Sequence, residues 1–348
     1  MEVPQAVDDT PPCVAAVGVG QRAGRRLDDV EQVGDSGMVG LQAVHDWADR
    51  GVGRAERGEQ QHVLGAVVSV HVAAVTQAVH LQLHEPTPWR RSTLGRMSSQ
   101  LAPGEAPAPP LRGELRYGLE FARLLADRDF RSPPRRAQEP AVLLVPGFMA
   151  GDQSLSVLVG WLRRRGSRTA GAGMLLNTDC AERAVGGIES RLRHLAERAE
   201  GRVVLIGQSR GGELARVAAL RNPDLVSTLV MLGSPVLAPL SVGPAVLGAV
   251  RSVARIGDLG VPGMLSTECR DGSCCVAFRE DLRAPLPPAV RAVAIYSRSD
   301  GIVSWEACLD PSADHVEVES SHTGMSVNLG VYRVLAGILD GEGDRWTG

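Results

Sequence analysis

The amino-acid sequence predicts an α/β protein with a mostly parallel sheet that is covered by helices on both faces. Short continuous apolar runs, which are typical of strands buried on both faces, recur along residues 141–322. Segments with apolar residues every three or four positions, which are typical of amphipathic helices, lie between and after these runs. Strands that alternate with helices generally pair in parallel, because each helix returns the chain to the same edge of the sheet.

The composition of the 348-residue chain excludes several classes of protein. All 37 basic residues are arginine, and 40 acidic residues bring the formal net charge to −3. A nucleic-acid-binding protein would show a clear basic excess, so we expect no nucleic-acid partner. The six cysteines are too few for a disulfide-stabilised fold. The most apolar stretch, residues 63–79, is interrupted by polar side chains, so no transmembrane segment is predicted.

The first 96 residues differ from the rest of the chain. They contain no Ile, Phe or Tyr, which supply much of the core of an ordinary domain. We interpret residues 1–96 as disordered or as an upstream extension that is not translated, with Met97 as the start; a small helical domain rich in Val and Ala is the alternative. The acidic start lacks a cationic segment followed by an apolar one, so we expect no signal peptide and a cytoplasmic location.

Residues 97–140 are predicted to form a linker followed by an amphipathic helix. The run SSQLAPGEAPAPP at residues 98–110 is rich in proline, as linkers often are. After it, the apolar residues Leu115, Leu119, Ala122 and Leu125 recur every three or four positions, which would place them on one face of a helix. We expect this stripe to pack on the domain that follows.

The domain at residues 141–348 is predicted to contain the sheet. The expected strands lie at residues 141–148, 202–209, 226–235, 290–300 and 315–322. The expected helices lie at residues 185–199, 211–220 and 327–338. Ligands of parallel sheets bind beyond the carboxyl ends of the strands, so the catalytic residues are expected there.

The strand at 202–209 ends in a sequence that fits the pattern G-x-S-x-G, from Gly207 to Gly211. Both glycines are expected, because the turn is so tight that a side chain at either position would collide with the neighbouring strand or helix. The turn holds the serine in a strained conformation with its hydroxyl exposed above the sheet. The pattern predicts that Ser209 is a catalytic nucleophile; a tight turn without catalytic function is the alternative.

A serine hydroxyl needs a base that removes its proton and an acid that orients the base. Asp300 ends the predicted strand at 290–300, and His322 ends the one at 315–322. The chain order Ser, Asp, His is the one found in α/β-hydrolase folds. We therefore predict that His322 is the general base and that Asp300 is its acid.

Other acids and histidines near these positions are less suitable. Asp310 lies in a Leu-Asp-Pro turn, and Asp314 and His315 come at the start of a strand instead of its end. His194 lies in a predicted helix. None of them is expected to reach the nucleophile.

The negative oxygen that develops during acyl transfer requires hydrogen-bond donors. The peptide N–H of Arg210 is one candidate. The N–H of Phe148 is the other, because the preceding Gly147 permits the backbone to turn this amide toward the pocket. The alternative is that the sequence Pro-Gly-Phe is a simple turn that ends the strand.

Residues from about 141 to 340 resemble an α/β-hydrolase of the lipase and esterase kind. The resemblance rests on four motifs in order along the chain: LLVPGF, GQSRGG, SRSDGIV and SSHTGM. It implies the α/β-hydrolase fold for the domain. Two positions depart from the family pattern, because Pro146 and Gln208 stand where histidine is frequent.

The segment at residues 236–289 is longer than a connection through a single helix requires. Its first part is apolar and rich in Gly and Pro. We predict a small cap there that lines an acyl pocket; a plain helix with loops is the alternative. The segment also contains Cys269, Cys274 and Cys275. Three thiols lack a fourth metal ligand unless Cys180 or Cys308 approaches them in the fold, so structural cysteines and no metal are expected.

These observations predict a serine hydrolase that cleaves carboxylic esters through an acyl-enzyme, with a small-molecule or lipid ester as substrate. No cofactor is expected. An acyltransferase or a thioesterase would use the same residues. A hydrolase-fold binding module without catalysis is the alternative from another class.

Overall fold

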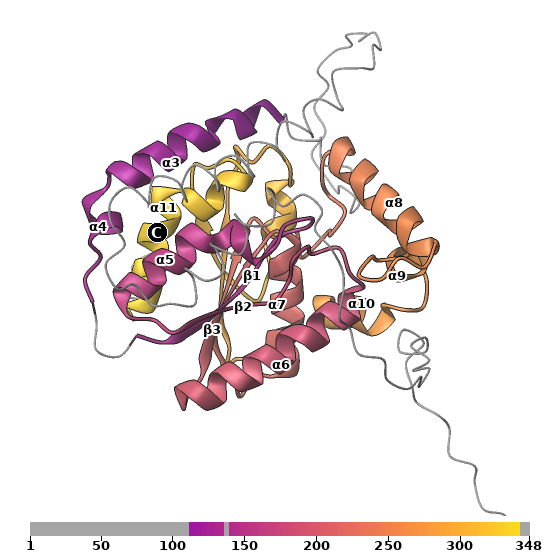
Figure 1. The fold of residues 1–348 in the computed structure, drawn as a ribbon, viewed down its shortest axis with the longest axis horizontal. Coiled ribbons are helices and arrows are strands. Elements are labelled where there is room, and N and C mark those ends of the chain that lie inside the picture. Colours follow the sequence, from indigo (N-terminus) through magenta and orange to yellow (C-terminus); the bar gives the residue numbers. More distant parts are fainter. Residues whose placement is uncertain (1–110, 136–138, 342–348) are drawn as a thin grey trace, which may run out of the picture. The chain divides into compact units, whose positions relative to one another are not determined.

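The computed structural model describes residues 111–135 and 139–341. The predictions for residues 1–96, for a start at Met97 and for the linker at 98–110 concern residues outside this part. Figure 1 shows the described part as a central sheet with helices on both sides. None of the described helices is long and apolar enough to cross a lipid bilayer.

A parallel sheet of six strands forms the centre of the described part. The strands lie in the spatial order β2, β1, β3, β4, β5, β6, and every neighbouring pair is parallel. Their bounds are Ala141–Val145 (β1), Thr169–Gly171 (β2), Val203–Gln208 (β3), Val226–Leu232 (β4), Arg291–Tyr296 (β5) and Asp314–Glu317 (β6). The predicted α/β class is therefore confirmed. The sequence did not predict β2, because its three half-buried residues form no apolar run.

The inner strands are buried on both faces, as their continuous apolar runs predict. Every residue of β1 and of β3 is buried. The register pairs Val145 with Gly207, and Gln208 with Leu232, so β1, β3 and β4 end at nearly the same level. The loops that follow these strands therefore meet at one edge of the sheet.

Helices cover both faces of the sheet. Figure 1 shows α3, α5 and α11 on one side and α6, α7 and α10 on the other. Their bounds are Tyr117–Ala126 (α3), Ser156–Arg165 (α5), Ala181–Ala199 (α6), Arg210–Arg221 (α7), Val276–Arg283 (α10) and Leu329–Leu339 (α11). Short 3-10 helices span Asp152–Leu155 (η2), Trp305–Cys308 (η3) and Thr323–Val327 (η4). The apolar residues Ile188, Leu192 and Leu195 recur at helical spacing and form part of the buried face of α6, whereas Ala199, which continues the spacing, is half-buried.

The N-terminal helical segment packs through a different face from the predicted one. It consists of η1 (Leu111–Arg116), α3 and α4 (Arg128–Arg131). The predicted stripe is wrong, because all four of its residues are exposed: Leu115 (76%), Leu119 (53%), Ala122 and Leu125. The buried face instead carries two aromatic rings, a leucine and two carboxylates, from Tyr117, Phe121, Leu124, Glu114 and Glu120. The glutamates could not be expected there, because their partners belong to loops distant in sequence.

The segment between β4 and β5 holds α8 (Pro244–Asp258), α9 (Thr267–Asp271) and α10. Figure 1 shows α8 and α9 at some distance from the sheet, whereas α10 packs against α7. The only buried side chains of α8 are Val253 and Ala254, which pack with Leu265 against Phe148. This segment therefore contacts the loop that follows β1.

Candidate active site

Ser209 occupies a sharp turn between β3 and α7. Its backbone has φ 53° and ψ −128°, a conformation that L-residues rarely adopt. A Cβ atom on Gly207 would lie 2.5 Å from the carbonyl oxygen of Gly211, and a Cβ atom on Gly211 would collide with the carbonyl oxygen of Val145. Glycine is therefore required at both positions, and the strained turn presents the serine at the carboxyl edge of the sheet.

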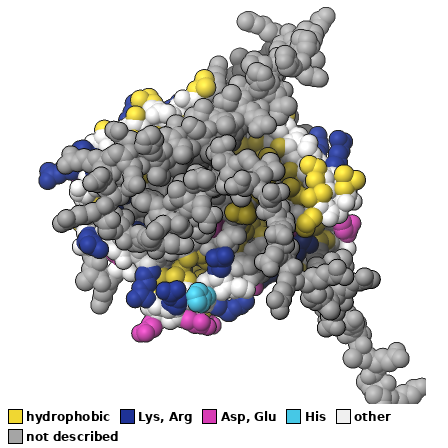
Figure 2. All heavy atoms as spheres, viewed as in Figure 1, with side chains coloured by type: hydrophobic (Ala, Val, Ile, Leu, Met, Phe, Trp, Pro, Cys, Tyr) yellow, Lys and Arg dark blue, Asp and Glu magenta, His cyan; other side chains and the backbone are white. Residues whose placement is uncertain are grey.

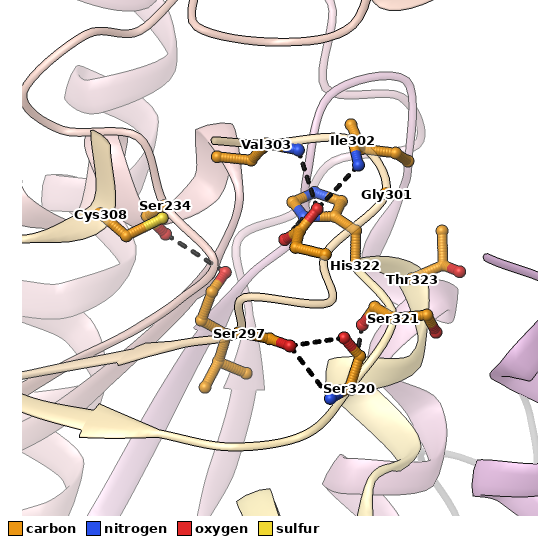
Figure 3. Close-up of polar contacts among 12 residues, drawn as sticks. Ser234, Ser297, Gly301, Ile302, Val303, Cys308, Ser320, Ser321, His322 and Thr323 are labelled. Carbon is orange, nitrogen blue, oxygen red and sulfur yellow. Dashed lines mark hydrogen bonds and ion pairs between the residues drawn. The ribbon is translucent and has the colours of Figure 1, made fainter. Parts of the chain in front are cut away.

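Asp300 and His322 form a buried pair after β5 and β6. Asp300 Oδ2 lies 2.7 Å from His322 Nδ1. The other carboxylate oxygen, Oδ1, accepts hydrogen bonds from the amides of Ile302 and Val303, both at 2.8 Å (Figure 3). The acid is therefore fixed on both oxygens, and it keeps the proton of a neutral imidazole on Nδ1, so that Nε2 is the acceptor.

The surroundings of His322 favour its charged form. Burial lowers the pKa of His322, but the negative charge of Asp300, the hydrogen bond to Asp300 and the charge of Glu114 raise it, and the net result is a pKa above the ordinary value. An imidazolium that forms when the base takes a proton is thereby stabilised.

The turn that carries Ser209 is connected to the loop that carries His322. Gln208 is buried, and its Nε2 donates a hydrogen bond of 3.1 Å to the carbonyl oxygen of His322. Within the described residues, the Ser209 hydroxyl forms no hydrogen bond with the imidazole. Hydrogen bonds of a catalytic serine are often long without substrate and shorten when it binds.

The loop after β1 lies against the candidate nucleophile. A Cβ atom on Gly147 would lie 3.3 Å from the Cβ atom of Ser209. Among the described residues, neither the amide of Phe148 nor the amide of Arg210 donates a hydrogen bond to a protein acceptor. Both amides are therefore available to an oxygen atom bound beside Ser209.

Asn177 holds this loop in place, a role that no pattern in the sequence indicates. Its side-chain Nδ2 donates to the carbonyl oxygen of Pro146 at 2.7 Å. Its backbone carbonyl oxygen accepts from the amide of Met149 at 3.1 Å. The guanidinium of Arg210 donates to the side chain of Asn177 and to the carbonyl oxygen of Asp179. The residue after the candidate nucleophile thus holds the segment at 177–179 as well.

The competing acids and histidines lie elsewhere. Asp310 is buried and pairs with Arg216, with 2.6 Å between Oδ2 and Nε. Asp314 is exposed at the start of β6, and His194 is exposed on α6. Nε2 of His315 lies 2.8 Å from the carbonyl oxygen of Asp310.

Glu114 connects the loops that carry the acid and the base. Its Oε1 accepts from the amides of Gly301 (3.1 Å) and His322 (2.8 Å). Its Oε2 accepts from the amide (2.9 Å) and the hydroxyl (2.7 Å) of Thr323. The side chain is buried. A carboxylate that accepts only N–H and O–H groups fixes this backbone more firmly than a neutral side chain could.

Glu120, which follows Glu114 by six residues in the N-terminal helical segment, holds the residues before His322. It accepts hydrogen bonds from the amide of Ser321 at 2.7 Å and from the hydroxyls of Ser321 and Ser320 at 3.0 and 3.3 Å. Figure 3 shows that Ser320 is also bound to Ser297, at the end of β5. Burial raises the pKa of Glu120, although these hydrogen bonds oppose the change. No pattern in the sequence indicates either glutamate, because their partners lie about 200 positions later in the chain.

One further buried carboxyl group, Glu213, lies one turn after Ser209 on α7. Burial raises its pKa to about 8, with the charge of Arg210 acting in the opposite direction. Among the described residues, the one group of side chains that could hold a metal ion consists of cysteines and does not include Ser209 or His322.

The strand order, the turn after β3 and the Asp–His pair after β5 and β6 define an α/β-hydrolase fold, as the four sequence motifs predicted. No protein-family model and no curated protein sequence matches the chain. Solved structures of low identity do match.

The mature lipase BlEst2 of Bacillus licheniformis matches with a TM-score of 0.45 and 14% identity over 60% of this chain and 94% of the other. The α/β hydrolase MGS-MChE2, from a metagenome of lagoon sediments, matches with a TM-score of 0.44 and 18% identity over 60% and 93%. The carboxylesterase CesB of Bacillus subtilis matches with a TM-score of 0.38 and 13% identity over 66% and 99%.

Proposed function

We propose that the protein is a serine hydrolase that cleaves carboxylic esters. In this mechanism, His322 accepts the proton of Ser209 at Nε2 while the serine oxygen attacks the ester carbonyl. Asp300 keeps the imidazole in the required tautomer and stabilises the imidazolium that forms. His322 then donates the proton to the departing alcohol, which leaves an acyl group on Ser209.

The amides of Phe148 and Arg210 would donate to the oxyanion of the tetrahedral intermediate. Because they make no hydrogen bond to described protein acceptors, they do not have to break one before they bind the developing charge. Water attacks the acyl-enzyme in the second half of the reaction, with His322 again as the base. No step requires a metal ion or an organic cofactor.

The observation that carries this proposal is the Asp300–His322 hydrogen bond of 2.7 Å in the loops beside the strained Ser209. A scaffold without catalytic function has no need of a strained serine, whose conformation costs about 1–3 kcal/mol. It also has no need of a buried histidine with one ring nitrogen bound to a fixed carboxylate. These features favour an enzyme over a binding module of the same fold.

The surface around the cap favours a substrate with an apolar acyl group. Figure 2 shows hydrophobic side chains exposed in the region of α8. The large hydrophobic residues exposed on this segment and on the loops after β1, β2 and β4 include Met149, Leu175, Leu176, Leu237, Leu240, Ile256, Leu259 and Val261. Exposed apolar patches commonly mark binding surfaces for ligands or membranes. We therefore expect esters of medium or long acyl chains to be cleaved faster than acetyl esters.

The test uses a fluorophosphonate probe and a series of p-nitrophenyl esters of graded chain length. The full chain should be labelled by the probe and should hydrolyse the esters. Ser209→Ala should abolish both while the melting temperature stays unchanged, because one small side chain is lost. Ser190→Ala, on the exposed face of α6, is the matched control and should be labelled normally. Labelling that persists in Ser209→Ala would refute the proposal.

A further inference from the structure

The fold brings Cys180 to three cysteines that lie about 90 residues later in the sequence. Cys180 precedes α6, and Cys269, Cys274 and Cys275 lie in and after α9. The four Sγ atoms all lie within 4.8 Å of one another. Only Cys269, Cys274 and Cys275 are neighbours in the sequence, because Cys180 lies 94 residues before Cys274.

Four of the six distances between these sulfur atoms are close to those of a tetrahedral metal site. Cys180 Sγ lies 3.5 Å from the Sγ atoms of both Cys274 and Cys275, and Cys274 Sγ lies 3.4 Å from Cys269 and 3.8 Å from Cys275. Four thiolates at a Zn–S distance of about 2.3 Å around one zinc ion are about 3.8 Å apart. A disulfide would require about 2.05 Å between two sulfurs, so none of these four pairs is bonded.

The groups around the cluster are suited to thiolates. The backbone N–H groups of Ala181 and Glu182, at the start of α6, are within hydrogen-bonding reach of Cys275 Sγ, and the N–H of Arg183 is within reach of Cys180 Sγ. The hydroxyl of Ser266 lies 3.4 Å from Cys269 Sγ. N–H and O–H donors to sulfur are the usual second layer of a metal–thiolate site.

Two arginines interact electrostatically with the cluster: Arg183 with Cys180 and Cys269, and Arg210 with Cys180 and Cys275. Zn²⁺ bound by four thiolates carries a net charge of −2, which positive charge nearby stabilises. Arg183 also pairs with Asp179, so it supplies only part of that charge.

We propose that Cys180, Cys269, Cys274 and Cys275 bind one structural Zn²⁺ ion. Binding exchanges four thiol protons for the metal and involves no change of oxidation state at zinc. Cys274 also forms a disulfide in this structure, so the four-thiolate site belongs to the chain after a thiol reductant has opened that bond, with two electrons passing from the reductant to the disulfide. A site closed by four protein ligands leaves no position for substrate, which assigns it a structural function.

The position of the site explains what it would stabilise. Cys180 follows Asp179, whose carbonyl oxygen accepts from the guanidinium of Arg210 at 2.6 Å. The other three ligands belong to the segment between β4 and β5, which is also held by Leu265 N–H to the carbonyl oxygen of Thr178 at 2.6 Å. The metal would fasten this segment to the loop that supports the candidate oxyanion amides.

The metal content of the full chain, expressed in medium that contains zinc and purified with a reductant and without chelator, tests the proposal. We expect about one zinc ion per chain by elemental analysis. The double variant Cys269→Ser/Cys275→Ser should lose it. Cys308→Ala is the matched control, because Cys308 is buried but lies outside the cluster, and this variant should keep its zinc. Removal of zinc by a strong chelator should lower the melting temperature of the wild type by about 5 °C or more and leave that of the double variant unchanged.

A second measurement keeps the proposal testable if the double variant does not fold. Titration of the reduced wild type with an organomercurial should release zinc as the thiols react, and Co²⁺ in place of zinc should give the visible absorption of tetrahedral cobalt thiolate. Reduced protein without zinc that also fails to bind Co²⁺ would overturn the proposal, as would equal zinc content in the wild type and a folded double variant. Iron in place of zinc would overturn the identity of the metal.

Discussion

The loop that carries His322 and the loop that carries Phe148 are held by different chemistry. Two buried carboxylates, Glu114 and Glu120, accept hydrogen bonds from the backbone and hydroxyls of the histidine loop. Neutral groups of Asn177 hold the Phe148 loop, and Arg210 in turn binds Asn177. The first arrangement places negative charge near the base, whereas the second uses neutral groups of Asn177 and the guanidinium of Arg210.

This difference corresponds to the charges that the two loops would meet during the proposed reaction. The histidine becomes positive when it accepts a proton, and a nearby carboxylate stabilises that charge. The oxygen beside Phe148 becomes negative, and a carboxylate there would oppose it. Substitutions that change the charge of either support should therefore alter catalysis more than substitutions that only remove packing.

The largest effect is expected at the acid itself. Asp300→Asn would place an amide against Nδ1 and favour the wrong imidazole tautomer, so we expect kcat to fall by about 10⁴-fold with the fold intact. Asp314→Asn, at the exposed start of β6, is the control and should retain full activity. Steady-state kinetics on one ester measures both. If Asp314→Asn were the damaging change, the acid would be wrongly assigned.

A smaller effect, on stability alone, is expected from the corrected face of α3. Phe121→Ala removes a buried ring and should lower the free energy of unfolding by about 3–5 kcal/mol. Leu119→Ala, on the face that the sequence wrongly predicted to be buried, should change it by less than about 0.5 kcal/mol. Urea denaturation compares the two variants. Equal losses of unfolding free energy would support the prediction that the face with Leu119 is buried.

The buried carboxyl group of Glu213 should make stability depend on pH. Its pKa of about 8 in the folded protein lies above the ordinary value, so the folded state binds the proton more tightly than the unfolded state. Stability should therefore fall as pH rises from 5 to 7.5, by about 1.4 kcal/mol for each pH unit.

Glu213→Gln, which cannot lose a proton, should remove this slope. Melting temperatures of the two proteins across this pH range provide the measurement. An identical slope in both proteins would show that other groups cause it.

The smallest effect is expected at Glu114. It distinguishes the carboxylates that hold the His322 loop from the neutral groups that hold the Phe148 loop. Glu114→Gln leaves buried donors of Thr323 facing an amide, which should lower kcat/KM by about 10- to 100-fold, corresponding to about 1–3 kcal/mol. Because the charge of Glu114 helps to raise the pKa of His322, the substitution should also move the acidic limb of the pH–rate profile to lower pH. In the wild type this limb should lie above the ordinary histidine value, since the folded-state pKa is raised.

Glu319→Gln is the matched control, because Glu319 is exposed and forms an ion pair with Arg116 at the surface. It should leave both the rate and the profile unchanged. A loss of rate in Glu114→Gln with an unshifted pH profile would mean that Glu114 acts only on folding.

Much of the candidate site could be predicted because it follows the chain locally. The turn from Gly207 to Gly211 is required by steric contacts within a few residues. Asp300 and His322 could be placed because parallel strands end at the same edge of a sheet, so a residue after each strand lies near the others. That argument predicted their proximity without any knowledge of the loops between them.

The sequence by itself therefore determined the α/β class, five of the six strands and the closeness of Asp300 and His322. These depend on apolar periodicity and on steric limits of the backbone, which neighbouring residues decide. Only the tertiary structure decided which face of α3 is buried, and which side chains hold the loops around the site. Glu114 reaches His322 across 208 positions, and Cys180 reaches Cys274 across 94. Such partners are selected by the shape of the packed chain, because a buried polar group binds whichever complementary group the fold brings within reach.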